Sequence, residues 1–336
     1  MAYCIDTGAE FDDDATTCPG CDADVEPIEP GGSPGEGEVF LLSSFRDEEE
    51  GLVMAFSEDL LHWTELPTAG LEPAVGDEIM RDPFIQRDPD GTFHMVWTSG
   101  WGRRDIGYAK TEDLVEWSEQ RLLPVMADEP DTKNCWAPKI FYDDAAGHWQ
   151  IAWSSWVEDP ERWGELDLPE TNKNNRIWYT TTPDFEELAA SEVLLDPGYS
   201  CIDAYLQEGD DEWLLFFKDG RYNKASGTHP EHQNIRIARS DDRYGPFGDV
   251  TEPITGYGPD EWHIEGPFAV RADGTYHVFH DVQYFHEYFG CVVSDDLTHW
   301  RDISRDLDAP LKLKHGNITT APADLVAESF GLRDAL

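Results

Sequence analysis

A short phrase that recurs five times constrains the fold more than any other feature of this sequence. Clear copies are FSEDLLHWTEL from Phe56, AKTEDLVEWSEQ from Ala109 and VVSDDLTHWRDI from Val292, and two weaker copies lie between the last two. The matching positions are Ser57, Thr111, Thr182, Ser240 and Ser294. Successive copies are 54, 71, 58 and 54 residues apart, so the chain contains five units of similar length.

Each unit is rich in short β-strand patterns. Segments such as PFIQRD and TFHMVWTSG are apolar or alternating, and Gly, Asp and Pro turns separate them. Multi-strand units that repeat at this period are typical of β-propeller blades. Five units therefore predict an all-β, five-bladed β-propeller. Two stacked sheets would have similar strands but would not produce a fivefold phrase.

The ends of the repeat region predict how the ring closes. The first unit begins at EVFLLSS, residues 38–44, and lacks the inner strand with which the other units begin. The segment LKLKHGNITTAPADL, residues 311–325, is extended and belongs to no other unit. Pairing this segment with the first unit would complete its blade and cover an open sheet edge.

The charge excludes one class of function. Seventy acidic residues against 24 basic residues give a formal net charge of −46. Such a chain repels the phosphate backbone, which excludes a nucleic-acid binder that acts through basic patches. The acids are spread among aromatic-rich segments, which indicates a halophilic protein suited to molar salt, where the Debye length is about 3 Å. A generic acidic protein is the alternative.

The sequence favours a cytoplasmic protein without a membrane span. No apolar run approaches the length that crosses a bilayer. The N-terminus MAYCIDTGAEFDDD has neither the basic nor the apolar region of a signal peptide.

The first 25 residues resemble a short zinc ribbon in which one ligand is replaced. Structural zinc in a ribbon is held by two Cys-x-x-Cys knuckles. Cys18 and Cys21 form an intact second knuckle, whereas the first has Cys4 but Thr7 in place of its second Cys. The three cysteines are candidate zinc ligands, and a decayed, metal-free ribbon is the alternative. The predicted organisation is a ribbon-like segment at 1–25, an acidic Pro/Gly linker at 26–38, the propeller at 39–325 and a tail at 326–336.

The inner strand of each blade lines the axis of a propeller, so side chains at the same end of these strands converge. Candidate inner strands begin MRDPFI, CWAPKIF, CIDAYL, HIEGPF and, from the tail, HGNITT. They bring together Asp82, Trp136, Asp203, Glu265 and His315. Three carboxyl groups at equivalent places on three blades suggest acid–base chemistry. The alternative for each is a buried structural carboxylate that accepts backbone hydrogen bonds.

The ordered set RDP, WAP, IDA, EGP and HG resembles glycoside hydrolase family 43, five-bladed propellers that act mostly on arabinosides and xylosides. The resemblance implies that Asp82 is the general base, that Asp203 tunes and orients the acid, and that Glu265 is the general acid. The chain departs from the family in two places. A partial unit precedes Asp82, whereas the family's base usually opens the first blade, and Ala204 follows Asp203 where the family usually has Pro.

The surroundings in sequence suggest how the roles divide. Inverting glycosidases hold their two carboxyl groups about 6.5–9.5 Å apart, which leaves room for a water. Glu265 lies between Ile264 and Gly266-Pro267, a less polar stretch that favours its protonated form.

Five further side chains are candidate substrate contacts. Trp136 and Trp101 are expected to stack on a sugar ring, with a place in the core as the alternative. Lys218 resembles a position near the family's site, although a lysine at a strand end is commonly solvated. His315 resembles the family's axial histidine, which in some members binds calcium or its waters; a hydrogen-bonded channel residue is the alternative. Arg81 precedes the first catalytic candidate, but on a strand its side chain should point elsewhere.

The sequence thus predicts an exo-acting, inverting glycosidase for α-L-arabinofuranosides or β-xylosides of small oligosaccharides, with no cofactor needed for the chemistry. Long insertions at 156–176 and 219–234 are expected to rim the funnel and favour chain ends. One alternative is a related hydrolase or phosphorylase for fructosides or mannosides. The chain lacks the Asn-Asp-Pro motif of fructoside enzymes and offers few basic residues for phosphorolysis. The other alternative is a non-catalytic sugar-binding propeller. The sequence does not indicate an oligomeric state.

Overall fold

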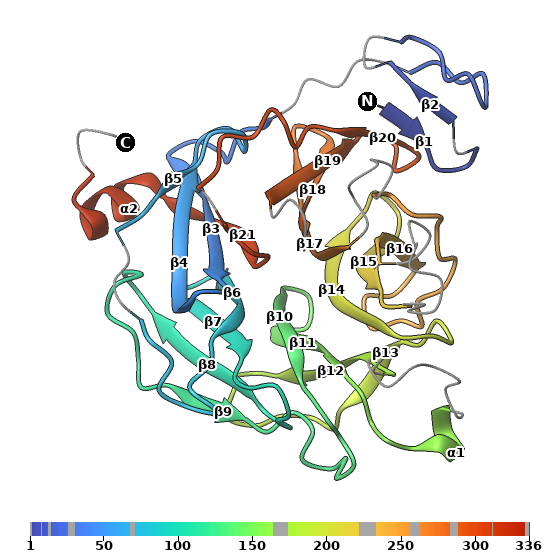
Figure 1. Cartoon of the computed structure of the whole chain (residues 1–336). Coiled ribbons are helices and arrows are strands. Elements are labelled where there is room, and N and C mark those ends of the chain that lie inside the picture. Colours follow the sequence, from blue (N-terminus) through green and yellow to red (C-terminus); the bar gives the residue numbers. More distant parts are fainter. Residues whose placement is uncertain are drawn as a thin grey trace.

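The computed structural model describes residues 2–7, 9–12, 15–25, 31–67, 71–163, 174–221, 233–255, 263–282, 288–310, 312–332 and 336. Over these residues the chain forms five antiparallel sheets that are arranged as blades around one axis (Figure 1). The only helices in the described ranges are α1 (Pro160–Trp163) and α2 (Ala323–Phe330). The predicted all-β, five-bladed propeller is confirmed.

The blades follow one another along the chain. The first contains β21 (Asn317–Pro322), β3 (Glu38–Arg46), β4 (Glu49–Ser57) and β5 (Thr64–Glu65). The second contains β6 (Arg81–Arg87), β7 (Phe93–Thr98), β8 (Ile106–Thr111) and β9 (Arg121–Leu123). The third contains β10 (Trp136–Asp143), β11 (His148–Ser155), β12 (Arg176–Thr182) and β13 (Glu192–Leu195). The fourth contains β14 (Cys201–Glu208), β15 (Trp213–Asp219) and β16 (Ile235–Ser240). The fifth contains β17 (Ile264–Ala272), β18 (Thr275–Val282), β19 (Tyr288–Ser294), β20 (His299–Asp302), β1 (Ala2–Cys4) and β2 (Ala9–Phe11).

The C-terminal segment closes the ring as predicted. Strand β21 pairs antiparallel with β3, with Asn317 opposite Ser43 and Ile318 opposite Leu42. It therefore supplies the inner strand that the first unit lacks, and no inner edge of that blade is left open.

The recurring phrase encodes the turn that follows the third strand of each blade. The five matching residues are the last residues of β4, β8, β12, β16 and β19. In the first blade the Ser57 hydroxyl accepts a hydrogen bond from the Leu60 N–H at 2.9 Å, and Leu60 has a positive φ of 67°. Thr111 and Leu114 repeat this contact at 3.0 Å in the second blade. The phrase is thus a local turn signal, although in the fourth blade the Ser240 hydroxyl accepts from the Asp242 N–H instead.

The N-terminal segment is joined to the propeller by a strand pair. Strand β1 pairs with β20 and so extends the fifth blade outward (Figure 1). The side chains of Tyr3 and Ile5 are buried in the propeller core, and the Tyr3 hydroxyl donates a hydrogen bond to the Ile254 carbonyl. Residues 26–30 of the predicted linker lie outside the described residues.

Much of the tryptophan content belongs to the core. The side chains of four tryptophans are fully buried; they are Trp97, Trp153, Trp178 and Trp300. The middles of the two long insertions, residues 164–173 and 222–232, lie outside the described residues. Across the part of the chain that the structure describes, there is no helix with the length and apolar character of a membrane span.

Candidate active site

Four inner strands carry the same bulge near the end where the candidate carboxyl groups lie. The pairing of β6 with β7 shifts register between Arg81 and Phe84, and β10, β14 and β17 shift at the corresponding places. The residues inside the four bulges have positive φ angles; they are Asp82 (54°), Ala137 (46°), Asp203 (57°) and Gly266 (64°). A left-handed conformation costs a non-glycine residue of order 1–3 kcal/mol and is concentrated at functional sites.

The positions of the candidate residues relative to the bulges show that they are not all equivalent, contrary to the prediction from the sequence. Asp82 and Asp203 occupy the same position on the second and fourth blades. Glu265 and Trp136 lie one residue earlier, at the position that Arg81 holds on β6. An alignment of the motifs RDP, WAP, IDA and EGP contains the same offset, because the aspartates are the middle residues of their motifs whereas Glu265 and Trp136 are the first.

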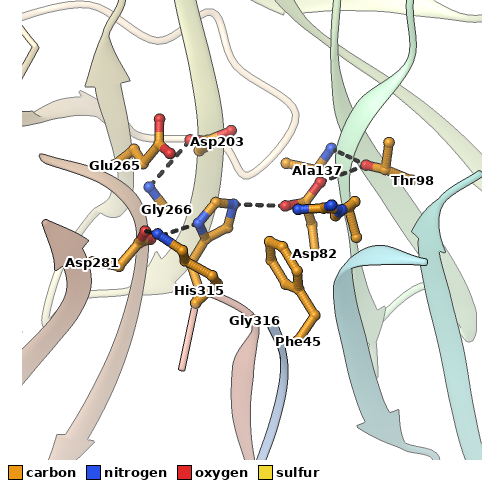
Figure 2. A network of polar contacts seen from close by, with 12 residues as sticks. Phe45, Asp82, Thr98, Ala137, Asp203, Glu265, Gly266, Asp281, His315 and Gly316 are labelled. Carbon is orange, nitrogen blue, oxygen red and sulfur yellow. Dashed lines mark hydrogen bonds and ion pairs between the residues drawn. The ribbon is translucent and has the colours of Figure 1, made fainter. Parts of the chain in front are cut away.

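The three candidate carboxyl groups gather around His315 (Figure 2). The Nε2 atom of His315 lies 2.7 Å from Oδ1 of Asp82, and its Nδ1 atom lies 2.6 Å from Oδ1 of Asp281. Asp281 is on β18, directly opposite Glu265 in the ladder. No local sequence signal marks Asp281, because it lies on the second strand of its blade and in no inner-strand motif.

His315 is held as a cation between these two carboxylates. Burial alone would lower the pKa of its imidazole, but Asp281 and Asp82 raise that pKa well above its ordinary value. Gly266 makes room for the ring, since a Cβ atom at residue 266 would lie 1.9 Å from Cγ of His315. The Gly of the EGP motif is thus required by this contact, because non-glycine residues adopt a similar φ angle at the equivalent positions of the other bulges.

Asp82 is a buried, ionised carboxylate. Its Oδ2 atom accepts a hydrogen bond from the Thr98 hydroxyl at 2.5 Å, and that hydroxyl accepts one from the Ala137 N–H at 2.8 Å. Burial opposes ionisation, but His315 and Thr98 outweigh it and hold the pKa of Asp82 below its ordinary value. The bulge places Asp82 inside the site, where it is charged at neutral pH.

Glu265 does not lie in the less polar environment that its sequence neighbours suggest. Its Oε2 atom accepts a hydrogen bond from Nζ of Lys218 at 2.5 Å, and Nε2 of His263 lies 3.4 Å away. Burial raises the pKa of Glu265, but Lys218 and His263 lower it well below its ordinary value. The expectation of a protonated Glu265 is therefore wrong for the ligand-free site. Lys218 is likewise buried, so the solvated alternative for this lysine is wrong.

Asp203 is the candidate carboxyl group whose pKa is raised, so it takes up a proton at mildly acidic pH. Its Oδ2 atom accepts a hydrogen bond from the Gly266 N–H at 3.1 Å. Burial raises the pKa of Asp203 to about 6, and the charge of Glu265 contributes in the same direction. The site thus contains a charged carboxylate, Asp82, and a carboxyl group, Asp203, that holds a proton at mildly acidic pH.

Lys139 is a further buried basic side chain at the site that the sequence did not reveal, although it belongs to the CWAPK motif. Its Nζ atom donates a hydrogen bond to the Gly316 carbonyl at 3.2 Å. Burial lowers the pKa of Lys139, and the charges of Asp82 and Asp203 oppose that effect.

The family of the chain follows from a comparison of its sequence with family models. Residues 37–324 match the family described as "Probable glycosyl hydrolase domain", Glyco_hydro_43_rel. This chain belongs to that family. It is therefore a glycosidase by family, and the resemblance that the inner-strand motifs indicated is confirmed.

Solved structures agree with the fold of the glycosidase. A thermostable family-43 glycoside hydrolase is 18% identical, with a TM-score of 0.53, and the match covers 71% of this chain and 74% of that one. The α-L-arabinanase of Cellvibrio cellulosa, solved with arabinohexaose, is 12% identical, with a TM-score of 0.57, and the match covers 85% and 97%. At these identities the likeness shows the fold alone. A search of curated proteins found no match.

The rim of the site carries an exposed aromatic surface. The Trp101 side chain is 55% exposed and meets Trp136 edge to face, with ring centroids 6.0 Å apart. The Arg81 guanidinium lies 5.6 Å from the Trp101 ring and pairs with Asp47 and Glu50. Arg81 thus points away from Asp82, as expected for neighbours on a strand. Because Trp101 is exposed, the core alternative does not describe it, and its ring suits a sugar face.

The residues around His315 form ion pairs and hydrogen bonds with one another and do not form a calcium site. Glu265, Asp281 and His315 place one donor atom each within 4.8 Å of one another. However, both ring nitrogens of His315 pair with carboxylates, Asp281 also lies 3.7 Å from Nζ of Lys314, and Glu265 pairs with Lys218. Calcium takes six to eight oxygen ligands, whereas these oxygens already face cations. The arrangement does not fit the ion, and no step is assigned to it.

Proposed function

We propose that this glycosidase removes α-L-arabinofuranosyl or β-xylosyl residues from the ends of small oligosaccharides with inversion of configuration. The observation that carries the proposal is the convergence of the three candidate carboxyl groups around His315 (Figure 2), with Asp82 charged and Asp203 able to hold a proton at mildly acidic pH. Inverting hydrolysis needs one group of each kind on opposite faces of the sugar.

In the proposed reaction Asp82 takes a proton from water while the water oxygen attacks the anomeric carbon. The bond from that carbon to the leaving oxygen breaks, and the leaving oxygen receives a proton from the acid. His315 and Thr98 orient Asp82 through their contacts with its two oxygens. His315 and Thr98 are therefore positioning residues.

We assign the final proton transfer to Glu265 and the storage of the proton to Asp203. The two groups titrate as a pair, and the pKa of Asp203, about 6, sets the upper end of the pH range in which the proton is present. Lys218 disfavours a proton on Glu265 while the two side chains are in contact. Protonation of Glu265 therefore requires that the bound substrate weaken the contact between Lys218 and Glu265.

The choice of substrate rests on three supports. The residue-by-residue match to family-43 motifs favours pentosides. The Cellvibrio arabinanase, which shares the fold, was solved with arabinohexaose. Trp101 offers an exposed ring at the rim for stacking. The exo mode rests on the two long insertions, at 156–176 and 219–234.

The experiment is a comparison of aryl glycosides in molar salt. We expect release from an aryl α-L-arabinofuranoside or β-xyloside, little from fructosides or mannosides, and no dependence on phosphate. The Asp82→Asn variant should lose about 10²–10⁴-fold in kcat because it lacks the base. Asp210→Asn, a change at an exposed aspartate on the fourth blade, is the matched control and should keep wild-type activity. Release from no glycoside, phosphate-dependent cleavage, or a fully active Asp82→Asn variant would contradict the proposal.

A further inference from the structure

Three thiols of the N-terminal segment gather around a histidine of the propeller. Cys4 is the last residue of β1, and Cys18 and Cys21 belong to the Cys-Pro-Gly-Cys turn. The sulfurs of Cys4 and Cys21 are 4.0 Å apart, and Nε2 of His299 lies 3.4 Å from the Cys21 sulfur. All four donor atoms lie within 4.8 Å of one another.

The strand pairing between β1 and β20 fixes half of this cluster. Cys4 is the direct ladder partner of His299. Residues directly opposite in an antiparallel pair present their side chains on the same face. The thiol and the imidazole are therefore brought together by backbone pairing, although 295 positions separate them in sequence.

The imidazole of His299 is oriented like that of a metal ligand. Its Nδ1 atom lies 2.6 Å from Oδ2 of Asp296, and Oδ1 of Asp296 accepts hydrogen bonds from the Thr298 and His299 N–H groups. A carboxylate on one nitrogen fixes the tautomer and leaves the other nitrogen with a lone pair. Here that other nitrogen, Nε2, faces the thiols.

The turn that contains the second knuckle is closed by backbone contacts. The Cys18 N–H donates to the Ala23 carbonyl at 2.9 Å, and the Asp22 N–H donates to the Cys18 carbonyl at 3.0 Å. A Cβ atom at Gly20 would lie 2.2 Å from Oγ1 of Thr7. Thr7 therefore packs against the knuckle, and the fourth donor of the cluster is His299.

We propose that Cys4, Cys18, Cys21 and His299 bind one structural Zn²⁺, with the propeller supplying the fourth ligand. With zinc–sulfur bonds of about 2.3 Å, sulfurs in a tetrahedral site lie about 3.8 Å apart, close to the observed 4.0 Å between Cys4 and Cys21. Three thiolates and an imidazole are a common ligand set for structural zinc. The ribbon-like sequence with Thr7 in place of a cysteine is thus compatible with a four-ligand site, because His299 supplies the fourth donor.

The bound ion would tie the first turn of the chain to the outer edge of the fifth blade. The ion joins β1, the Cys18–Cys21 turn and β20, so its binding free energy would stabilise the docked N-terminal segment. This role is independent of glycoside hydrolysis and is tested without it.

The repeat provides a matched control. The first blade has the same phrase, and its His62 pairs with Asp59 through Nδ1 at 2.7 Å, as His299 does with Asp296. The His62 side chain is 69% exposed and belongs to no thiol cluster among the described residues. His62→Ala therefore removes the same side chain from the same turn without touching the proposed site.

The first experiment measures zinc in the full-length chain after dialysis against a weak chelator in molar salt. We expect about one zinc per chain in the wild type and in His62→Ala, and a loss of at least tenfold in zinc affinity in His299→Ala and Cys18→Ser. A wild type without zinc, or a His299→Ala variant with unchanged affinity, would overturn the proposal.

A second measurement needs no variant and so does not depend on whether the variants fold. X-ray absorption at the zinc edge of the wild type should give three sulfur ligands at about 2.3 Å and one nitrogen ligand at about 2.0–2.1 Å. Four sulfur ligands, or an oxygen ligand in place of the imidazole, would overturn it.

Discussion

Replacing His315 with Gln tests the electrostatic design of the site. The side chains of Asp82 and Asp281 are 8% and 1% exposed, and His315 contacts both. The substitution leaves two buried carboxylates without the cation between them. Removal of one partner from a buried ion pair typically costs about 3–5 kcal/mol. Lys314, 3.7 Å from Asp281, offsets part of this, so we expect a loss of about 3 kcal/mol in the free energy of unfolding at neutral pH.

The loss should depend on pH in one direction. The pKa of His315 is raised in the folded state, so its contribution is complete below the unfolded value of about 6.5 and disappears as pH rises through the folded value. The stability difference between wild type and His315→Gln should therefore shrink toward alkaline pH. Urea unfolding in constant molar salt, followed by tryptophan fluorescence, measures it.

A double variant separates charge from shape. His315→Gln combined with Asp281→Asn removes one of the orphaned carboxylates, so stability should recover in part. The activity of the double variant should stay low, because Asp82 still lacks its partner His315. Without that cation the pKa of Asp82 should rise, which moves the acidic limb of the kcat/KM profile to higher pH. A His315→Gln variant as stable as wild type, or a difference that grows with pH, would refute the reasoning.

Four further outcomes follow from the same structure. Asp203→Asn should move the limb of the pH profile that lies near pH 6, and an unchanged profile would show that Asp203 does not store the proton. Glu265→Gln should slow substrates with poor leaving groups by about 10²–10⁴-fold and spare activated aryl glycosides, and equal losses on both would argue against an acid. Trp101→Ala should raise KM with little change in kcat, and a change in kcat alone would exclude a stacking role. Because the net charge is −46, the protein should unfold at lower temperature in dilute buffer, and an unchanged melting temperature would end the halophile interpretation.

The fold could be predicted because its signal is local and repeated. The phrase at Ser57 and its copies encodes a turn through hydrogen bonds within four residues, so a sequence pattern is enough to count the blades. Closure by β21 could be predicted because the first unit lacks an inner strand, and because the extended segment at 311–325 belongs to no other unit.

The site could be predicted only in part. Asp82, Asp203, Glu265 and His315 were found because they begin inner strands. Asp281 was missed because it reaches the site from a second strand. The pairing of Glu265 with Lys218, and of Cys4 with His299, depends on strand register between distant segments, which no local motif encodes.

The stereochemistry of the first-formed sugar tests the division of roles between Asp82 and the acid pair most directly. Proton NMR of early hydrolysis in molar salt distinguishes the two anomers before they interconvert. If Asp82 activates water opposite the leaving oxygen, the first sugar must have the anomeric configuration opposite to that of the substrate. A product that retains the substrate's configuration would make Asp82 a nucleophile and contradict the proposed mechanism.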